Sequence, residues 1–234
     1  MEIFKNITLY NGDCMEVLKS LPDNAYDLAI VDPPYGGGGT EKWTTKPRSR
    51  FGGHFDKYEI KATRTGGTWS EKYQGGENDI RHWDIAPSPE YFDELFRVSK
   101  NQIIWGGNYF HLPPTRCFAV WRKLTISETF SMAMCEYAWT SFDGNAKWIE
   151  IAPQGNAKLQ RIHPTQKPVA LYGWLLNNFA KEGDKILDTH LGSGSICIAA
   201  HDLGFEMLGI ELDPVYYNAA KQRLLYHQAQ LGLF

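Results

Sequence analysis

Short apolar runs alternate with stretches of helical spacing along most of the chain. The runs are rich in β-branched or aromatic residues and end at a glycine, a proline or an acid, which is typical of buried strands. The strands that this pattern predicts cover residues 7–10, 29–31, 101–108, 117–121, 132–139, 186–188 and 207–210. The predicted helices cover residues 14–21, 90–98, 168–180 and 196–203, with a last one from 214 onward.

Strands that alternate with helices favour an α/β fold of the doubly wound type. A length of 234 residues suits one such domain with room for an insertion. We therefore expect a single domain over residues 1–234. Residues 36–85 and 141–161 break the periodicity and are expected to be insertions.

Composition narrows the class of protein. An apolar content of 43% provides a core, and a net charge of −3 gives no global basic character, so any nucleic-acid contact must be local. Cys14, Cys117, Cys135 and Cys197 have no C-x-x-C spacing, which argues against a disulfide framework or a zinc site and favours a reducing cytoplasm. No apolar run approaches the roughly 18 residues of a membrane span.

The apolar run at 29–31 ends in Asp32-Pro33-Pro34-Tyr35. Because proline lacks a backbone N–H, the strand stops there and the Asp32 carboxylate lies where open α/β sheets bind ligands. Asp32 and the Pro33 carbonyl can accept the N–H groups of an exocyclic amine, and Tyr35 can stack on a base flipped out of a duplex. The motif thus indicates alkylation of a nucleobase amino group. The plainer alternative is a Pro-Pro turn capped by an acid.

The chain from Lys185 reads as strand, glycine turn, helix and strand. The strands end in Asp188 and, roughly 20 residues later, in Glu211, a spacing typical of nucleoside-binding units. The turn contains Leu191, Gly192, Ser193 and Gly194 but lacks a phosphate-binding pattern. S-adenosylmethionine carries a ribose and a cationic tail without phosphate, so it suits these acids. We expect Asp188 to bind its ammonium group, Glu211 its ribose, and the backbone at 191–194 to line the tail.

The first insertion has a net basic part. Its bases are interleaved with aromatic residues, a composition that fits phosphate contacts and base stacking. The residues expected to bind nucleic acid are Lys42, Lys46, Arg48, Arg50, Lys57, Lys61 and Arg64. A solvated loop is the alternative interpretation. Residues 141–161 are polar and rich in turns, and they are a second candidate segment for nucleic-acid contacts.

Three motifs follow one another in a defined order: Asp32-Pro33-Pro34-Tyr35, His163-Pro164-Thr165-Gln166-Lys167-Pro168, and the glycine turn with its strand-end acids. This order resembles the β group of DNA amino-methyltransferases, a circular permutation in which the cofactor half follows the catalytic half. The close spacing is similar to that of small phage or prophage adenine methyltransferases. One residue departs from the family pattern, because His190 stands where a phenylalanine is typical.

The resemblance implies a Rossmann-like S-adenosylmethionine-dependent methyltransferase fold. Its sheet would be mostly parallel and seven-stranded, with one reversed strand and helices on both faces. The family's catalytic positions correspond to Asp32, Pro33, Pro34 and Tyr35, and its cofactor positions to Asp188, Gly192, Gly194 and Glu211. Asp13 corresponds to an adenine contact, and Thr165 lies in the segment beside the methionine tail. Taken alone, Asp13 predicts a helix N-cap, with Glu16 completing a capping box, and Thr165 or Gln166 predicts another N-cap.

These features favour an S-adenosylmethionine-dependent enzyme that methylates the N6 amino group of adenine in double-stranded DNA, with no metal. Family members tend to have Asp at the first catalytic position for adenine and Ser for cytosine N4, so cytosine N4 is the near alternative. Methyltransferases acting on protein amides or RNA are more distant, and a nucleic-acid-binding module without catalysis is a different class. A homodimer is compatible with the family. The hypothesis requires Asp32 and Glu211 to face a common cleft.

Overall fold

The computed structural model describes residues 1–35, 85–129, 133–153 and 161–231. Within them, one sheet has the strand order β1-β2-β9-β8-β3-β4-β6-β5-β7. The strands are β1 (Glu2–Phe4), β2 (Ile7–Asn11), β3 (Tyr26–Val31), β4 (Ser99–Trp105), β5 (Phe118–Lys123), β6 (Cys135–Thr140), β7 (Lys147–Ile151), β8 (Lys185–Asp188) and β9 (Glu206–Glu211). The helices are α1 (Cys14–Ser20), α3 (Pro89–Val98), α4 (Val169–Phe179), α5 (Ser195–Asp202) and α6 (Pro214–Leu231), with a short 3₁₀ turn η2 (Gly107–Tyr109).

The expected seven-stranded sheet lies inside the observed nine. Strands β2, β9, β8, β3 and β4 are mutually parallel, β6 runs antiparallel to β4, and β5 runs antiparallel to β6. Seven strands with one reversed are therefore present, and β1 and β7 extend the two edges. The expected strand count was too low by these two edge strands. Part of the expected insertion at 141–161 forms strand β7, because Lys147–Ile151 pairs with β5.

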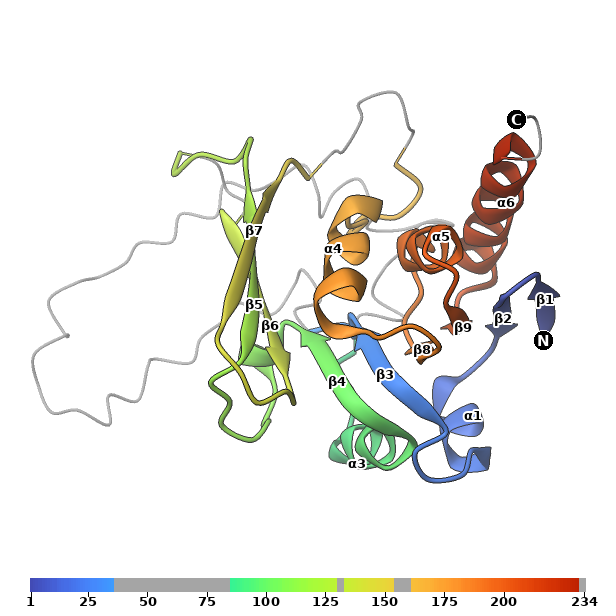
Figure 1. Ribbon diagram of the computed structural model, residues 1–234, viewed down its shortest axis with the longest axis horizontal. Helices are drawn as coiled ribbons and strands as arrows, with labels where there is room; N and C mark the ends of the chain where they lie inside the picture. The colour runs from blue at the N-terminus through green and yellow to red at the C-terminus, as the bar shows by residue number, and fades with distance from the viewer. Residues whose placement is uncertain (36–84, 130–132, 154–160, 232–234) are drawn as a thin grey trace, which may run out of the picture.

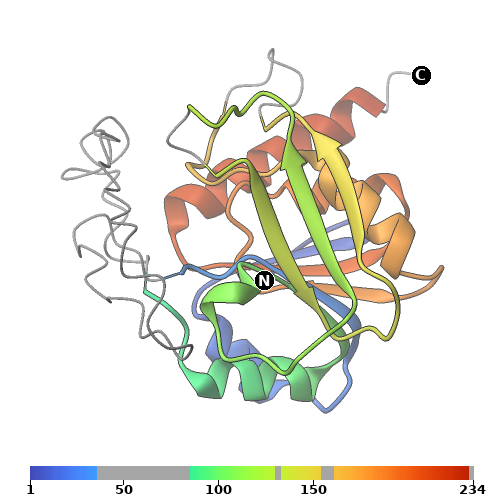
Figure 2. The same ribbon diagram turned by 90° about the vertical axis from the view of Figure 1, so that its left-hand side faces the viewer.

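Helices cover both faces of the sheet, as expected. Figure 1 shows α4, α5 and α6 on one face and α1 and α3 on the other. Alternate residues of β3 divide between two buried clusters: Leu28 and Ile30 pack with α4 and α5, whereas Ala29 and Val31 pack with α1 and α3. A strand with apolar residues on both sides is what a sheet covered on both faces requires. In Figure 2 the outer strands β5 to β7 face the viewer, in green and yellow.

Helix starts were predicted with mixed success. Asp13 caps α1 as expected, since its side chain accepts the Met15 amide (2.8 Å), but the described residues show no capping-box bond between a side chain and an amide of Asp13 and Glu16. The cap expected from Thr165 or Gln166 is wrong, because α4 begins after Pro168, which makes no side-chain cap bond. In the described part of the chain no helix is long and apolar enough to cross a membrane, and all four cysteines are free thiols.

The start of α6 provides a test of local stability. Asp213 Oδ1 accepts the amides of Val215 (2.7 Å) and Tyr216 (3.3 Å), and Pro214 occupies the first helical position. We expect Asp213→Ala to lower the free energy of unfolding by about 1 kcal/mol, the usual value of an N-cap side chain. Urea denaturation measures it. Asp213→Asn keeps the acceptor and should stay close to wild type; equal losses in both variants would contradict the capping role.

Candidate active site

Four neighbouring strands carry an acid at or just after their carboxyl ends. In the order of the sheet these are Asp13 after β2, Glu211 at the end of β9, Asp188 at the end of β8 and Asp32 after β3. Because the strands are parallel, the four acids lie along one edge. Burial, together with the charges of Asp32 and Glu211, raises the pKa of Asp188 to about 8. The structure therefore brings the two halves of the predicted site together at a shared edge.

Both carboxylate oxygens of Asp32 have partners. The Tyr35 hydroxyl donates to Oδ1 at 2.9 Å, and the ammonium group of Lys167 contacts Oδ2. Burial and the charges of Asp32 and Glu136 raise the pKa of Tyr35, so its hydroxyl stays protonated and donates. Pro33 is buried and Pro34 is half-buried behind this pair. Asp32 is thus held by one neutral and one cationic donor.

The Tyr35 ring lies against the turn that follows β4. It stacks on Tyr109, with ring centroids 4.7 Å apart and planes inclined by 18°, and meets Phe110 edge-on at 6.1 Å. Gly106, with a φ of 65°, lets the ring approach: a Cβ at this position would lie 2.2 Å from the tyrosine ring. The carboxyl end of β4 is therefore shaped to hold an aromatic ring beside Asp32.

The glycine turn after β8 is held by Glu211. The Gly192 amide donates to Oε2 at 2.7 Å and the Asp213 amide donates to Oε1 at 2.9 Å. Gly192 and Gly194 have φ values of 53° and 67°, a region that favours glycine. The Leu191 side chain is buried in the core, so only its backbone can line a ligand site.

Ser193 of this turn binds inward. Its hydroxyl lies 3.1 Å from that of Ser195, the first residue of α5, and the Ser193 carbonyl accepts a hydrogen bond from Arg223 of α6 at 2.9 Å. Ser193 therefore ties the turn to α6, and its side chain does not reach out of the turn.

Asp188 is almost fully buried. Among the described residues, the His190 amide is the one donor to its carboxylate, at 2.9 Å. The imidazole of His190 lies 2.9 Å from the Thr189 hydroxyl and meets Tyr91 of α3 edge-on, and burial lowers the pKa of His190 to about 4. A neutral aromatic ring thus fills the position where the family has phenylalanine, and it keeps the turn packed.

The segment around Thr165 flanks the glycine turn. The His163 ring would lie 3.5 Å from a Cβ on Gly192, and it meets Tyr216 edge-on at 4.3 Å. Thr165 is exposed, and its hydroxyl lies 3.1 Å from His163 Nδ1. Asp13, also exposed, is engaged as the cap of α1.

Lys167 and Glu136 also lie at the carboxyl edge of the sheet, beside Asp32, although the sequence analysis gave neither a role in the site. Lys167 is 4% exposed and contacts Asp32 and, at 3.2 Å, Glu136. The motif around Lys167 was expected to start a helix and to flank the cofactor, and its local sequence carries no signal that the lysine is buried. The contact joins residues 135 positions apart, so only the tertiary fold reveals it.

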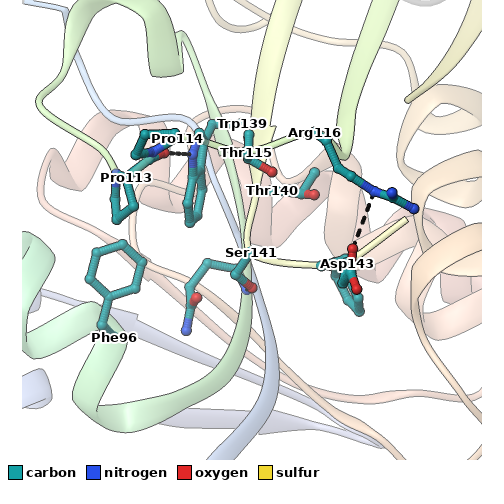
Figure 3. Close-up of a pocket in the computed structure, with 11 residues that line it drawn as sticks. Phe96, Pro113, Pro114, Thr115, Arg116, Trp139, Thr140, Ser141 and Asp143 are labelled. Carbon is teal, nitrogen blue, oxygen red and sulfur yellow. Dashed lines mark hydrogen bonds and ion pairs between the residues drawn. The ribbon is translucent and has the colours of Figure 1, made fainter. Parts of the chain in front are cut away.

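The residues expected to bind nucleic acid, from Lys42 to Arg64, lie outside the described residues. A cavity of about 510 Å³ is present elsewhere (Figure 3). Phe96, Trp139 and the paired Arg116 and Asp143 line it, at the end of the sheet where β6 ends and β5 begins. None of the predicted site residues belongs to this cavity.

Comparison with solved structures identifies the fold. The fold is that of S-adenosylmethionine-dependent DNA methyltransferases: the chain matches the M1.HpyAVI–SAM complex (19% identity, TM-score 0.54, 93% of this chain and 100% of that one). It also matches the cytosine-N4-specific PvuII DNA methyltransferase (13% identity, TM-score 0.58, 94% and 86%). At these identities the likeness defines the fold.

The sequence comparisons are more specific. The family model N6_N4_Mtase, described as DNA methylase, matches residues 117–222. The chain is 28% identical to YubD of Escherichia coli (strain K12), whose name describes it as a methylase, over 91% of this chain and 88% of that protein. It is 25% identical to the type II methyltransferase M2.MboI of Moraxella bovis, over 96% and 89%. The resemblance to DNA amino-methyltransferases of the N6/N4 type is confirmed.

Replacement of Gly106 tests whether the Tyr35 ring depends on the close packing against this glycine. In Gly106→Ala the new methyl group would collide with the Tyr35 ring, so we expect the tyrosine near-UV circular dichroism to change and the protein to lose stability. Gly183→Ala is a matched control, because Gly183 has a φ of 86° but no atom within 4 Å of the added Cβ. Each variant carries backbone strain of about 1–3 kcal/mol, and only Gly106→Ala should alter the tyrosine spectrum. The same spectral change in both would mean that Tyr35 does not depend on Gly106.

Proposed function

We propose that the protein transfers a methyl group from S-adenosylmethionine to the exocyclic N6 of adenine in DNA, on a base flipped out of the double helix. The observation that carries this proposal is the position of Asp32. Its carboxylate lies at the end of β3, beside the stacked Tyr35 ring and on the same edge as Asp188, the glycine turn and Glu211. An acceptor for an amine, an aromatic surface and acids suited to a cationic nucleoside thus adjoin one another.

The acids at the ends of β8 and β9 fit the cofactor. Asp188 is a buried carboxyl with a raised pKa and a single amide donor, and a cation beside it would restore its charged form. We assign it the methionine ammonium group. Each carboxylate oxygen of Glu211 accepts one backbone amide. A carboxylate has further acceptor sites, which can bind the ribose hydroxyls. Bound S-adenosylmethionine supplies an electrophilic methyl group.

Several other residues complete this side of the proposal. The backbone of Leu191, Gly192, Ser193 and Gly194 would line the methionine tail. Thr165 lies beside the turn through His163. Asp13, whose carboxylate already caps α1, would use its remaining acceptor sites for the adenine of the cofactor.

At the target base, the chain positions an amine and accepts its N–H groups. Asp32 Oδ1, which here accepts the Tyr35 hydroxyl, would accept one amino N–H, and the Pro33 carbonyl would accept the other. These bonds turn the nitrogen lone pair toward the methyl group. The bound cofactor would supply the methyl group and retain the C–S electron pair, and Asp32 or water would take the proton that the methylated amine loses. Pro34 keeps the turn rigid, and Tyr35 stacks on the base. Orientation and electrostatics carry most of the acceleration.

The choice of adenine rests on Asp32, because the family tends to have Asp at this position for adenine and Ser for cytosine N4. The structural neighbours do not decide, since the PvuII enzyme is named as cytosine-N4-specific. Cytosine N4 is therefore the second candidate. Transfer of a labelled methyl group to plasmid DNA, followed by nucleoside analysis, distinguishes N6-methyladenine from N4-methylcytosine. A protein that binds DNA but transfers nothing would be a binding module.

We expect Asp32→Ala to abolish methyl transfer, because the amine loses its acceptor. Binding of the cofactor should stay within about threefold of wild type, since in the proposal Asp32 does not touch the cofactor's polar groups; an effect of this size is well below 1.4 kcal/mol. Labelled-methyl incorporation and calorimetric titration with S-adenosylhomocysteine measure the two quantities. Loss of both would make Asp32 a structural residue.

Cofactor binding should release a proton from Asp188. Its pKa of about 8 leaves the carboxyl mostly protonated at pH 7, whereas a bound ammonium group favours the carboxylate. Titration of S-adenosylmethionine at pH 7 in buffers of different protonation enthalpy should therefore show release of close to one proton. The release should disappear in Asp188→Asn and persist in Asp143→Asn, where an exposed acid is changed. Equal release from wild type and Asp188→Asn would remove Asp188 from the cofactor site.

A further inference from the structure

Lys167 is a buried cation with acidic partners on both sides. Its ammonium group contacts Asp32 Oδ2 and Glu136 Oε2, the latter at 3.2 Å, and lies 5.2 Å from the centre of the Trp105 ring. Burial alone would lower the pKa of Lys167, but the charges of Asp32 and Glu136 outweigh it and raise the pKa. Lys167 therefore remains charged although it is removed from water.

The charges continue away from Asp32 with alternating sign. Glu136, near the start of β6, also pairs with Lys123 at the end of β5, at 2.5 Å. Lys123 is itself 6% exposed and lies over the Trp121 ring at 5.2 Å. Burial works against the charge of Glu136, but Lys167 and Lys123 lower its pKa. The row Asp32–Lys167–Glu136–Lys123 thus anchors the residue after β3 to two outer strands of the sheet.

A buried ion pair is a costly way to gain stability, because each ion loses its hydration. What such a pair does provide is a fixed direction for each group. Asp32 follows the end of a strand and precedes two prolines, and its carboxylate has two oxygens that could exchange places by rotation. The Lys167 ammonium binds Oδ2, whereas among the described residues the more weakly held Oδ1 carries only the neutral Tyr35 hydroxyl.

We propose that Lys167 is a positioning residue for Asp32: it holds Oδ2 and leaves Oδ1 as the oxygen that accepts the amino group of the target base. The inference rests on the proposed function and deepens it. When the base enters, its N–H takes the place of the Tyr35 hydroxyl on Oδ1, and the Lys167 contact on Oδ2 does not change. Glu136 acts one step further away by fixing the ammonium group.

Lys167 also offsets the acids of this edge. Asp188 lies close enough for the charge of Asp32 to raise its pKa, and for that of Lys167 to lower it. Without Lys167, the edge would hold Asp32, Asp188 and Glu136 with one cation fewer.

The test compares Lys167→Met, Lys167→Arg and Glu136→Gln with Lys100→Met, a control that removes an exposed lysine paired with Asp27. We expect Lys167→Met to lower kcat by about 100-fold, the cost of misplacing a catalytic group by roughly 1 Å. The Kd for S-adenosylhomocysteine should stay within about threefold, a small change in free energy. Lys167→Arg should recover part of kcat, Glu136→Gln should lose less than Lys167→Met, and Lys100→Met should match wild type.

Thermal unfolding provides a readout that does not need activity. If Lys167 and Asp32 are paired, the double variant Lys167→Met/Asp32→Asn should lose less in Tm than the sum of the two single losses. Additive losses would overturn the pairing, and an unchanged kcat in Lys167→Met would overturn the positioning role. If Lys167→Met does not fold, the smaller change Glu136→Gln decides, and its failure to alter kcat would also overturn the inference. Failure of the proposed function looks different, because wild type itself would then transfer no methyl group to DNA.

Discussion

Carboxylates crowd the carboxyl edge of this sheet, and the way each one is compensated determines what the edge can do. Neighbouring carboxylates cannot all stay ionised without partners. Asp32 is compensated by the buried ammonium group of Lys167, and Glu211 by two backbone amides. Asp188 lies between them with a single amide, and its pKa rises to about 8. One acid is therefore ion-paired, one is bound by the backbone, and the third is suited to a cation from outside.

The same edge joins two halves of the sheet. On one side, Glu211 and the glycines after β8 shape a turn that needs a positive φ at two positions. On the other side, Gly106 after β4 makes room for the Tyr35 ring. Asp32 lies at the junction and is anchored to β6 and β5 through Lys167 and Glu136. The outer strands thereby contribute to the geometry of Asp32 through Glu136 and Lys123.

Sequence patterns located most elements because burial on both faces leaves continuous apolar runs, as in β3, β8 and β9, and because prolines and glycines mark their ends. The two strands that were missed lie at the edges of the sheet. Residues of β1 and β7 are half-buried or exposed, so they lack the apolar pattern by which the inner strands are recognised. The cap of α4 was misplaced for a related reason: the polar residues before Pro168 bind elsewhere, with Gln166 accepting the Ile162 amide and Thr165 contacting His163.

The sequence by itself determined the order of the motifs, the acids at the strand ends and the glycine turn, because each depends on residues close together along the chain. The tertiary structure alone decided which strands are neighbours and hence that Asp32, Asp188 and Glu211 share one edge. It also decided that Lys167 is buried against Asp32 and that Tyr35 lies on Gly106. Charge compensation and close packing depend on distance in space. Residues 135 positions apart, such as Asp32 and Lys167, become partners only in the folded chain.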